Sequence, residues 1–466
     1  MKFQKMMFVS ALCMLISFSF TACDDDNDDK GGVPTEVVTN VSFTDTDKET
    51  AKIGGTLSWT APSSVENITK YIVYQSNDGK GKDVKLGDVP VGTNSFAIPA
   101  GTAFSAYLLV VASNIQGEAT SMAQVGVSDM INEPMPTVVG VYFLNSGKSK
   151  SNNATLDYYN PITKELKTKV FTSVNGRGLG DTANDMVIYG SKMYIAVTNS
   201  NTIEVTDLNA KSLKTISPKD ESGQPQSPRH FTTYNGNVYV TLFDGHLAAI
   251  DTTSMEIVKQ VKVGPNPEEV CVTNGKFYVA NSGGYNLVQD STLSVVDAAT
   301  FAVEKNPLKV VINPSLVKAD TEGNLYVMSL GNYGDIKATV QRVDPKTGQS
   351  TIICTNEKIS MTMSNDKLYI LSSESNASTN WMAANTKYMI YDAKKAAVET
   401  ENFITDGTTI SKIGFINVDP IENNIYMTAG DYTSTGDMFI YSATGTRINK
   451  LGVSGLNPMG AYFVVK

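Results

Sequence analysis

Apolar and polar residues alternate along short segments through most of this chain, and one such segment recurs seven times. Each copy contains a tyrosine inside an apolar run, as in GKFYVAN at 275–281 and NLYVMS at 324–329. The tyrosines of the seven copies are Tyr142, Tyr194, Tyr239, Tyr278, Tyr326, Tyr369 and Tyr426. They are on average about 47 residues apart, a spacing typical of repeated supersecondary units. The alternation has a period of two, which predicts strands and excludes a helical repeat.

Two further features accompany each tyrosine segment. A strand that ends in a tight turn precedes it, as in EEVCVTNGK at 268–276, and a third strand that ends in an aspartate follows it. These aspartates are Asp207, Asp251, Asp297, Asp344 and Asp392, and we expect their carboxylates to accept backbone N–H bonds in turns. With a fourth, more variable strand, the unit predicts an all-β, seven-bladed β-propeller over residues 138–466.

The end of the chain predicts how this ring closes. GLNPMGAYFVV at 455–465 matches the first strand of a unit, but no further strand follows it. The first tyrosine segment, VVGVYFLN at 138–145, has no such strand before it. We therefore expect the last strand to pair with the first segment, which leaves no open sheet edge at the join.

A smaller all-β domain is predicted before the propeller, over residues 35–130. Its short alternating strands place Trp59, Tyr71 and Leu108 in the core of a sandwich. The W-x-x-P at 59–62, the Y-x-V-Y at 71–74 and the V-A-S-N at 111–114 resemble a fibronectin type III module. The proline-containing stretch 131–137 is expected to be a linker, and the sandwich itself a spacer.

The N-terminus predicts export. Residues 1–22 have a basic start and an apolar run of about thirteen residues, which is too short to span a bilayer and typical of a signal peptide. Thr21-Ala22-Cys23 resembles the end of a bacterial lipobox, although Phe20 departs from the usual leucine, and this resemblance implies that Cys23 is lipidated. The acidic linker at 23–34 resembles an export tag of surface lipoproteins. These resemblances imply a lipid-anchored protein of the outer membrane, exposed at the cell surface; the alternative is a cleaved signal with a chance cysteine.

The composition and the absence of known motifs reduce the classes of function that we expect. The net charge is −9 and the basic residues are scattered, which argues against a nucleic-acid partner. Cys271 and Cys354 lie in strand-like segments and are expected to be buried and unpaired. The chain has two histidines and no motif of a hydrolase, P-loop or zinc site, so we expect no enzyme, cofactor, metal or catalytic residue. The remaining alternative is a metal-dependent lactonase-like hydrolase that uses Asp185, His230 and one of Glu268 and Glu269, since alternation would aim at most one of these glutamates at the channel.

Ligand binding is instead expected on one face of the propeller. The connections between second and third strands are long in several units, and in a propeller they share a face with the entries to the inner strands. These connections and entries contain charged, amide and aromatic side chains that suit a large polar ligand. The candidate ligand-binding residues are Arg177, Asp181, Asn184, Asp185, Arg229, His230, Glu268, Tyr285, Tyr333, Trp381 and Tyr432.

Several phrases also resemble a known family. VYFLNSG at 141–147, NGRGLGDTANDM at 175–186 and GPNPEEV at 264–270 resemble YncE-like propeller lipoproteins, and most closely the BtuG-type group that captures cobalamin. The resemblance covers about residues 138–466, and the added sandwich is a departure from it. It implies that the protein captures cobalamin (vitamin B12) and passes it to a TonB-dependent outer-membrane transporter. The alternative is an adhesin that binds a glycan or a protein.

Overall fold

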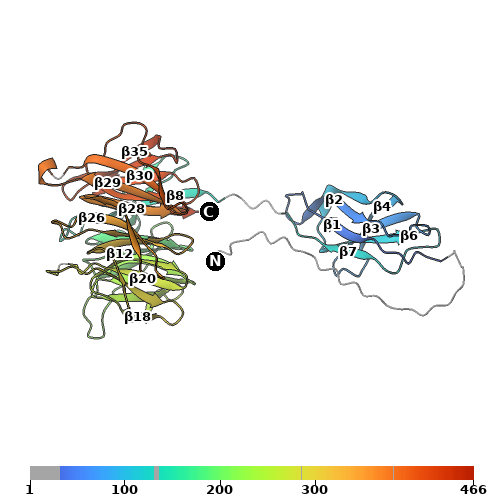
Figure 1. Cartoon of the computed structure of the whole chain (residues 1–466), viewed down its shortest axis with the longest axis horizontal. Coiled ribbons are helices and arrows are strands. Elements are labelled where there is room, and N and C mark those ends of the chain that lie inside the picture. The colour runs from blue at the N-terminus through green and yellow to red at the C-terminus, as the bar shows by residue number, and fades with distance from the viewer. Residues whose placement is uncertain (1–31, 131–135, 285, 381) are drawn as a thin grey trace. The chain divides into compact units, whose positions relative to one another are not determined.

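The computed structural model describes residues 32–130, 136–284, 286–380 and 382–466. The signal peptide, Cys23, most of the acidic linker and most of the linker at 131–137 lie outside these residues. Two compact units are present, a β-sandwich before Pro136 and a β-propeller after it (Figure 1). No helix of the described residues is long and apolar enough to cross a membrane.

The first unit is a sandwich of two antiparallel sheets. One sheet has the order β1-β2-β5 and the other the order β4-β3-β6-β7. The strands are β1 (Thr39–Phe43), β2 (Lys52–Thr60), β3 (Lys70–Ser76), β4 (Val84–Pro90), β5 (Ser95–Ala103), β6 (Tyr107–Ser113) and β7 (Ala123–Gly126). Trp59, Tyr71 and Leu108 are buried between the sheets, as predicted, and the first two rings meet edge to face at 5.5 Å. Membership of the fibronectin type III family stays a prediction.

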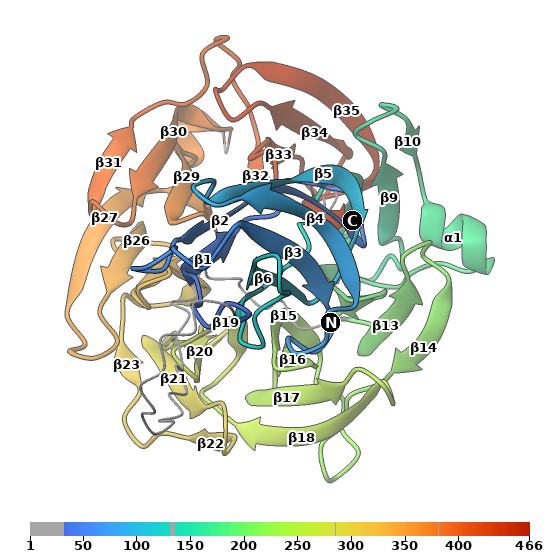
Figure 2. The same ribbon diagram turned by 90° about the vertical axis from the view of Figure 1, so that its right-hand side faces the viewer.

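The second unit is a propeller of seven blades, each with four main strands ordered from the inside outward. Figure 2 shows the blades around a ring, with β14, β18, β22, β27, β31 and β35 at its periphery. Blade 1 consists of β36 (Pro458–Val465), β8 (Val138–Asn145), β9 (Thr155–Tyr159) and β10 (Leu166–Lys167). Blade 2 consists of β11 (Ala183–Tyr189), β12 (Lys192–Val197), β13 (Thr202–Asp207) and β14 (Ser212–Ile216). Blade 3 consists of β15 (Pro228–Tyr234), β16 (Asn237–Leu242), β17 (His246–Asp251) and β18 (Glu256–Lys262).

The remaining four blades follow the same pattern along the chain. Blade 4 consists of β19 (Pro267–Thr273), β20 (Lys276–Asn281), β21 (Thr292–Asp297) and β22 (Ala302–Val303), with β23 (Leu308–Lys309) also paired to β21. Blade 5 consists of β24 (Pro314–Ala319), β25 (Leu325–Ser329), β26 (Ala338–Val343) and β27 (Ser350–Asn356). Blade 6 consists of β28 (Lys358–Ser364), β29 (Lys367–Glu374), β30 (Ala384–Asp392) and β31 (Ala397–Thr400). Blade 7 consists of β32 (Ile413–Val418), β33 (Ile425–Ala429), β34 (Thr435–Tyr441) and β35 (Arg447–Leu456).

The predicted repeat is confirmed in its details. The seven tyrosine segments are the second strands β8, β12, β16, β20, β25, β29 and β33. The third-strand aspartates accept backbone N–H bonds in turns; Asp251, for example, accepts from Ser254 at 2.6 Å and Asp297 from Thr300 at 2.8 Å. The repeated sequence pattern therefore predicts both the order of the strands in each blade and the turns that follow the third strands. Two short helices, α1 (Val170–Asn175) and the 3-10 helix η1 (Ala377–Thr379), lie in connections and were not predicted.

The ring closes as the sequence predicts. The C-terminal strand β36 pairs antiparallel with β8, from Pro458 opposite Asn145 to Val465 opposite Val138. At the end of this ladder the backbones of Thr137 and Lys466 exchange two hydrogen bonds, of 2.8 and 3.0 Å. Blade 1 is thus built from both ends of the propeller unit.

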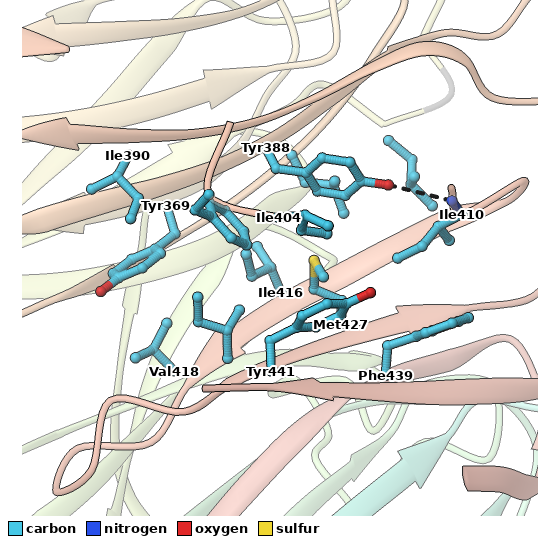
Figure 3. Close-up of a cluster of buried hydrophobic side chains, with 14 residues drawn as sticks. Tyr369, Tyr388, Ile390, Ile404, Ile410, Ile416, Val418, Met427, Phe439 and Tyr441 are labelled. Carbon is cyan, nitrogen blue, oxygen red and sulfur yellow. Dashed lines mark hydrogen bonds between the residues drawn. The ribbon is translucent and has the colours of Figure 1, made fainter. Parts of the chain in front are cut away.

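Adjacent blades are held together by apolar clusters between their faces. Figure 3 shows the cluster between blades 6 and 7, where Tyr369 and Tyr388 pack near Met427 and Tyr441. The hydroxyl of Tyr388 accepts the backbone N–H of Ile410 at 3.3 Å. Similar clusters lie between the other neighbouring blades, so both faces of an inner strand look toward neighbouring blades.

Candidate functional site

The propeller face that carries the entries to the inner strands also carries the connections between second and third strands. The first residue of such a connection donates its N–H to the residue just before the inner strand in six blades. The pairs are Ser146 to Asn457, Thr198 to Thr182, Phe243 to Ser227, Ser282 to Asn266, Leu330 to Asn313 and Gly430 to Lys412. We call this side the loop face; the C-terminus lies on the opposite side, as the β29–β30 connection and the terminus show in Figure 1.

The entries to the inner strands have an irregular backbone that the alternating pattern does not reveal. Six of the seven inner strands have a register shift near their first residues, whereas β28 pairs with β29 without one. The residue before the strand is left-handed in five blades, with φ of 60° at Thr182, 52° at Ser227, 48° at Asn266, 62° at Asn313 and 48° at Asn457. Asparagine adopts this conformation more readily than most residues, which accounts for the recurring Asn-Pro pairs. Such bulges redirect side chains at the start of a strand.

Five of the predicted ligand-binding residues meet in the ring of inner strands. His230 is buried, with its Nδ1 3.5 Å from Asp185 Oδ2 and its Nε2 3.7 Å from Glu268 Oε2. Arg229 donates to Glu268 Oε2 through Nε at 2.9 Å and through a terminal nitrogen at 2.6 Å. Asn184 donates to the Arg229 carbonyl at 3.1 Å and lies 3.1 Å from His230 Nε2. The three blades 2, 3 and 4 are joined here by one polar network.

The network continues on both sides of these residues. The hydroxyl of Tyr462, on the closing strand, donates to Asp185 Oδ1 at 2.9 Å. Glu269 accepts from the backbone N–H of Val317 at 2.7 Å and pairs with Lys318 at 2.6 Å. Buried charges of this kind are stable only when they are paired and hydrogen-bonded, and each carboxylate here has such partners.

Glu268 and Glu269 point in opposite directions, as the alternation predicts. Glu268 reaches Arg229 on β15 and Glu269 reaches Val317 on β24, both of which are inner strands. Each glutamate therefore faces a neighbouring blade, and both belong to the ring of inner strands.

The charges of the network shift its titration. Burial alone would raise the pKa of Asp185, but its bond to His230, the charge of that ring and the N–H of Phe231 outweigh burial and lower it. Burial alone would lower the pKa of His230, but Asp185 and then Glu268 and Glu269 raise it. The pKa of Tyr462 lies well above its usual value because of burial and of the neighbouring Asp185. Both shifts favour the charged form of the pair of Asp185 and His230.

This titration predicts a pH-dependent stability. A histidine whose folded pKa is raised stabilises the fold fully below its ordinary pKa of about 6.5, and the stabilisation is lost as pH rises through the folded pKa. We expect the free energy of unfolding in urea to fall as the pH rises above about 6.5, and His230→Gln to flatten this slope. His246→Gln, on the third strand β17 and outside the polar network, is the matched histidine control and should keep the slope of the intact chain. An unchanged slope in His230→Gln would contradict the assignment.

The residues named for the hydrolase alternative are engaged in ion pairs. Among them no group of three or more His, Cys, Asp or Glu side chains is placed to hold a metal ion. The carboxylates of Glu268 and Glu269 are paired with Arg229 and Lys318, respectively. The paired side chains of the network therefore form a fixed polar surface at the entries to the inner strands.

Exposed apolar side chains form a second feature of the loop face. They lie on the connections between second and third strands of four consecutive blades, 4 to 7. These residues are Leu287, Val288, Tyr333, Ile336, Met382 and Tyr432, and we call them the apolar arc. Tyr333 is 76% and Tyr432 55% exposed. Large apolar side chains grouped in this way on one face usually mark an interaction site.

The other predicted residues are placed as follows. Asp181 accepts from Thr182 at 2.7 Å and from Asn199 at 3.2 Å, which ties together connections of the loop face. Arg177 pairs with Glu204 at 2.7 Å in blade 2, away from the inner ring. Tyr285 and Trp381 lie outside the described residues.

Sequence reasoning missed Leu287, Val288, Ile336 and Met382. The sequence indicates them only weakly, because single apolar residues inside polar loops are common.

The prediction that both cysteines are buried was wrong. Cys271 and Cys354 are unpaired, as expected, but only partly buried, and burial raises the pKa of both thiols.

Comparisons with known proteins identify the family of the propeller unit and two similar solved structures. A family described as "Domain of unknown function (DUF5074)" matches residues 139–463, which is more than half of the chain. No curated protein matches the chain significantly. A crystal structure of a protein from Lactobacillus plantarum is similar with a TM-score of 0.47 and 12% identity, and covers 70% of this chain and 100% of that one. The WD40 β-propeller domain of Doa1 is similar with a TM-score of 0.43 and 12% identity, and covers 63% of this chain and 93% of that one.

Proposed function

The chain belongs to this domain family of unknown function, and we propose that it is a surface lipoprotein that captures a large polar ligand on the loop face of its propeller. Cobalamin is the favoured ligand, and a TonB-dependent outer-membrane transporter is the proposed recipient. Binding rather than catalysis is proposed, because Asp185, His230, Arg229 and Glu268, the ionisable side chains of the polar network, are paired with one another.

The observation that carries the proposal is the composition of the loop face. The apolar arc spans blades 4 to 7, and the polar network of Asn184, Arg229 and Glu268 lies at the entries to the inner strands of blades 2 to 4. A corrinoid has apolar ring edges, several amides and a phosphate, so it suits a face that offers both apolar contacts and fixed donors. Because the connections are built on rigid blades, little conformational entropy is lost when a ligand binds.

The proposal is tested by calorimetry with cyanocobalamin on the full chain carrying Cys23→Ser, which removes the proposed acylation site. We expect saturable binding with one site per chain, and a melting temperature that rises with ligand concentration. Absence of both responses at saturating cyanocobalamin would exclude cobalamin as the ligand.

The apolar arc predicts which substitutions weaken binding. Tyr333→Ala and Tyr432→Ala should each weaken it roughly three- to tenfold, since an aromatic contact contributes about 0.5–1.5 kcal/mol beyond burial. Both side chains are exposed, so the fold should be unaffected. Ile352→Ala is the matched control, because Ile352 is 62% exposed but lies on the outer strand β27. Equal affinities in all three variants would place the ligand elsewhere.

A second candidate function is recognition of a glycan or a protein. The exposed rings of Tyr333 and Tyr432 favour it, since sugars stack on aromatic rings as readily as corrinoids contact them. A glycan array distinguishes the two: binding to a defined set of glycans without any response to cyanocobalamin would favour the adhesin.

A further inference from the structure

A cavity of about 660 Å³ lies at blade 3, outside both the apolar arc and the polar network. Its volume is within the range of about 300–1,000 Å³ that is typical of small-molecule sites. One wall belongs to β17 and β18, and the other is the connection between β14 and β15 at 217–227. The lining residues are all polar or charged and include Lys219, Asp220, Glu221, Gln226, His246 and Lys262. The cavity therefore suits a polar ligand.

The strand wall lies on the loop face and looks toward blade 2. His246 is the first residue of β17 and follows the β16–β17 connection directly. Lys262 is opposite His246 in the β17–β18 ladder, and Gln260 is opposite Ala248. These side chains leave the sheet on the side of Ala248, which packs toward blade 2. Lys262 is exposed, so its ammonium group is accessible to a ligand.

Hydrogen bonds at the base of the cavity hold the two walls together. Gln226 is only 1% exposed, and its Nε2 donates to Asp244 Oδ2 at 3.0 Å and to Gln260 Oε1 at 2.8 Å. Gln260 donates back to Gln226 Oε1 at 3.0 Å, and Asp244 Oδ2 lies 2.9 Å from His246 Nδ1. The Asn201 side chain accepts the backbone N–H of Gln226 at 3.0 Å. The walls are thus positioned before any ligand binds, which reduces the entropy lost on binding.

The opposite wall presents two carboxylates. The backbone of its turn is closed by the N–H of Asp220, which donates to the Gln224 carbonyl at 3.0 Å. Asp220 Oδ1 accepts the N–H groups of Ser222 at 2.9 Å and Gln224 at 2.8 Å, whereas its Oδ2 has no hydrogen-bond partner among the described residues. Glu221 is exposed, and in the described part of the chain its carboxylate has neither an ion pair nor a hydrogen bond. Both side chains can therefore accept from a ligand.

The charges of the lining balance one another. Lys219 and Lys262 are exposed, and neither ammonium group forms an ion pair or a hydrogen bond with the residues that the structure describes. Their two positive charges equal the negative charges of Asp220 and Glu221, so a simple anion or cation is attracted by one pair and repelled by the other. A hydroxyl group both donates and accepts, and neighbouring hydroxyls on a sugar ring can use the ammonium groups and the carboxylates together.

We propose that this cavity binds a saccharide, whose hydroxyls accept from Lys219 and Lys262 and donate to Asp220 and Glu221. The lining residues include no aromatic ring, so hydrogen bonds to charged groups provide the affinity. The site does not rest on the proposed function, since no residue of the apolar arc lines the cavity.

The test is saturation-transfer NMR on the full chain carrying Cys23→Ser, with glucose, galactose, N-acetylglucosamine, maltose and lactose as probes. Each sugar is used at about 10 mM, which fills most of a site whose dissociation constant is about 1 mM. We expect at least one of these sugars to bind. Lys219→Met and Lys262→Met should each weaken binding roughly tenfold, because hydrogen bonds to charged groups are stronger than those between neutral groups.

Lys259→Met is the matched control for Lys262→Met. Lys259 is also exposed and also lies on β18, but it is opposite Ala249, which packs toward blade 4. Its replacement should leave sugar binding unchanged. Equal losses in the two variants would overturn the site.

Three further outcomes would also overturn the inference. These are binding of none of the five sugars, binding of inorganic phosphate without any sugar, and loss of sugar binding in Tyr333→Ala but not in Lys262→Met, which would place the sugar on the apolar arc. Cyanocobalamin binding is measured on the same preparations. If it persists where the sugars fail, the proposed function stands without this site.

Discussion

Deletion of residues 457–466 should abolish the cooperative unfolding of the propeller. The deletion removes β36, so that the backbone of β8 loses its inner partner strand, and the buried side chains of Val141 and Phe143 become exposed. It also removes the Tyr462 hydroxyl that binds Asp185 in the polar network. Each buried apolar side chain contributes about 1.5–3 kcal/mol, so the two exposed here alone should cost about 3–6 kcal/mol, which is comparable to the lower end of typical domain stability, about 5 kcal/mol. The loss of cooperative unfolding is measured by circular dichroism during thermal unfolding, and the compactness of the variant by size-exclusion chromatography.

A rearranged chain serves as the control for this deletion. Thr137 and Lys466 exchange two backbone hydrogen bonds, so a two-residue Asn-Gly turn can join them. Residues 457–466 placed before Thr137 through this turn, in a chain that ends at Leu456, should restore cooperative unfolding. A deletion variant that unfolds like the intact chain would show that β36 contributes little to closure.

Substitution of Glu268 by glutamine should cost about 3–5 kcal/mol of unfolding free energy, because it leaves the Arg229 guanidinium without its carboxylate in a largely buried place. The side chain keeps its size, so the effect reports the lost charge and not a cavity. Urea unfolding at pH 7 gives the free energy. The pair is less than a quarter exposed on either side, which distinguishes it from a surface ion pair.

Glu399→Gln is the matched control for Glu268→Gln. Glu399 pairs with Lys367 at 2.7 Å, but the two side chains are 36% and 40% exposed, so the loss should stay below about 1 kcal/mol. The double variant Arg229→Met with Glu268→Leu should recover most of the stability, because apolar side chains replace both charges. Equal costs for Glu268→Gln and Glu399→Gln would contradict a buried, coupled network.

The blade count and the closure of the ring were predictable because they rest on repetition. Seven tyrosine segments and one unmatched terminal strand each report the same unit, so an error in one copy does not change the total. The core of the sandwich was predictable for a similar reason, since Trp59, Tyr71 and Leu108 follow the alternation of their strands.

The site was less predictable because it depends on departures from the repeat. The bulges at the entries to the inner strands interrupt the regular ladders, so the partners of Glu268 and Glu269 on the neighbouring blades do not follow from the alternation. The partners of Arg177 and Arg229 could not be distinguished either, since both are single arginines in similar loops, yet one pairs within the outer part of blade 2 and the other within the inner ring. Which residues of adjacent blades meet depends on how the blades are arranged in the ring. The sequence of a single segment does not specify this arrangement.

The pairing of Thr137 with Lys466 has a practical consequence for assays. The polypeptide enters and leaves the propeller at one point, on the side away from the loop face. A purification tag or a fluorescent protein that is fused after Lys466 therefore begins on the side of the propeller opposite to the loop face. Immobilised on a biosensor through such a tag, the protein should keep its full capture capacity.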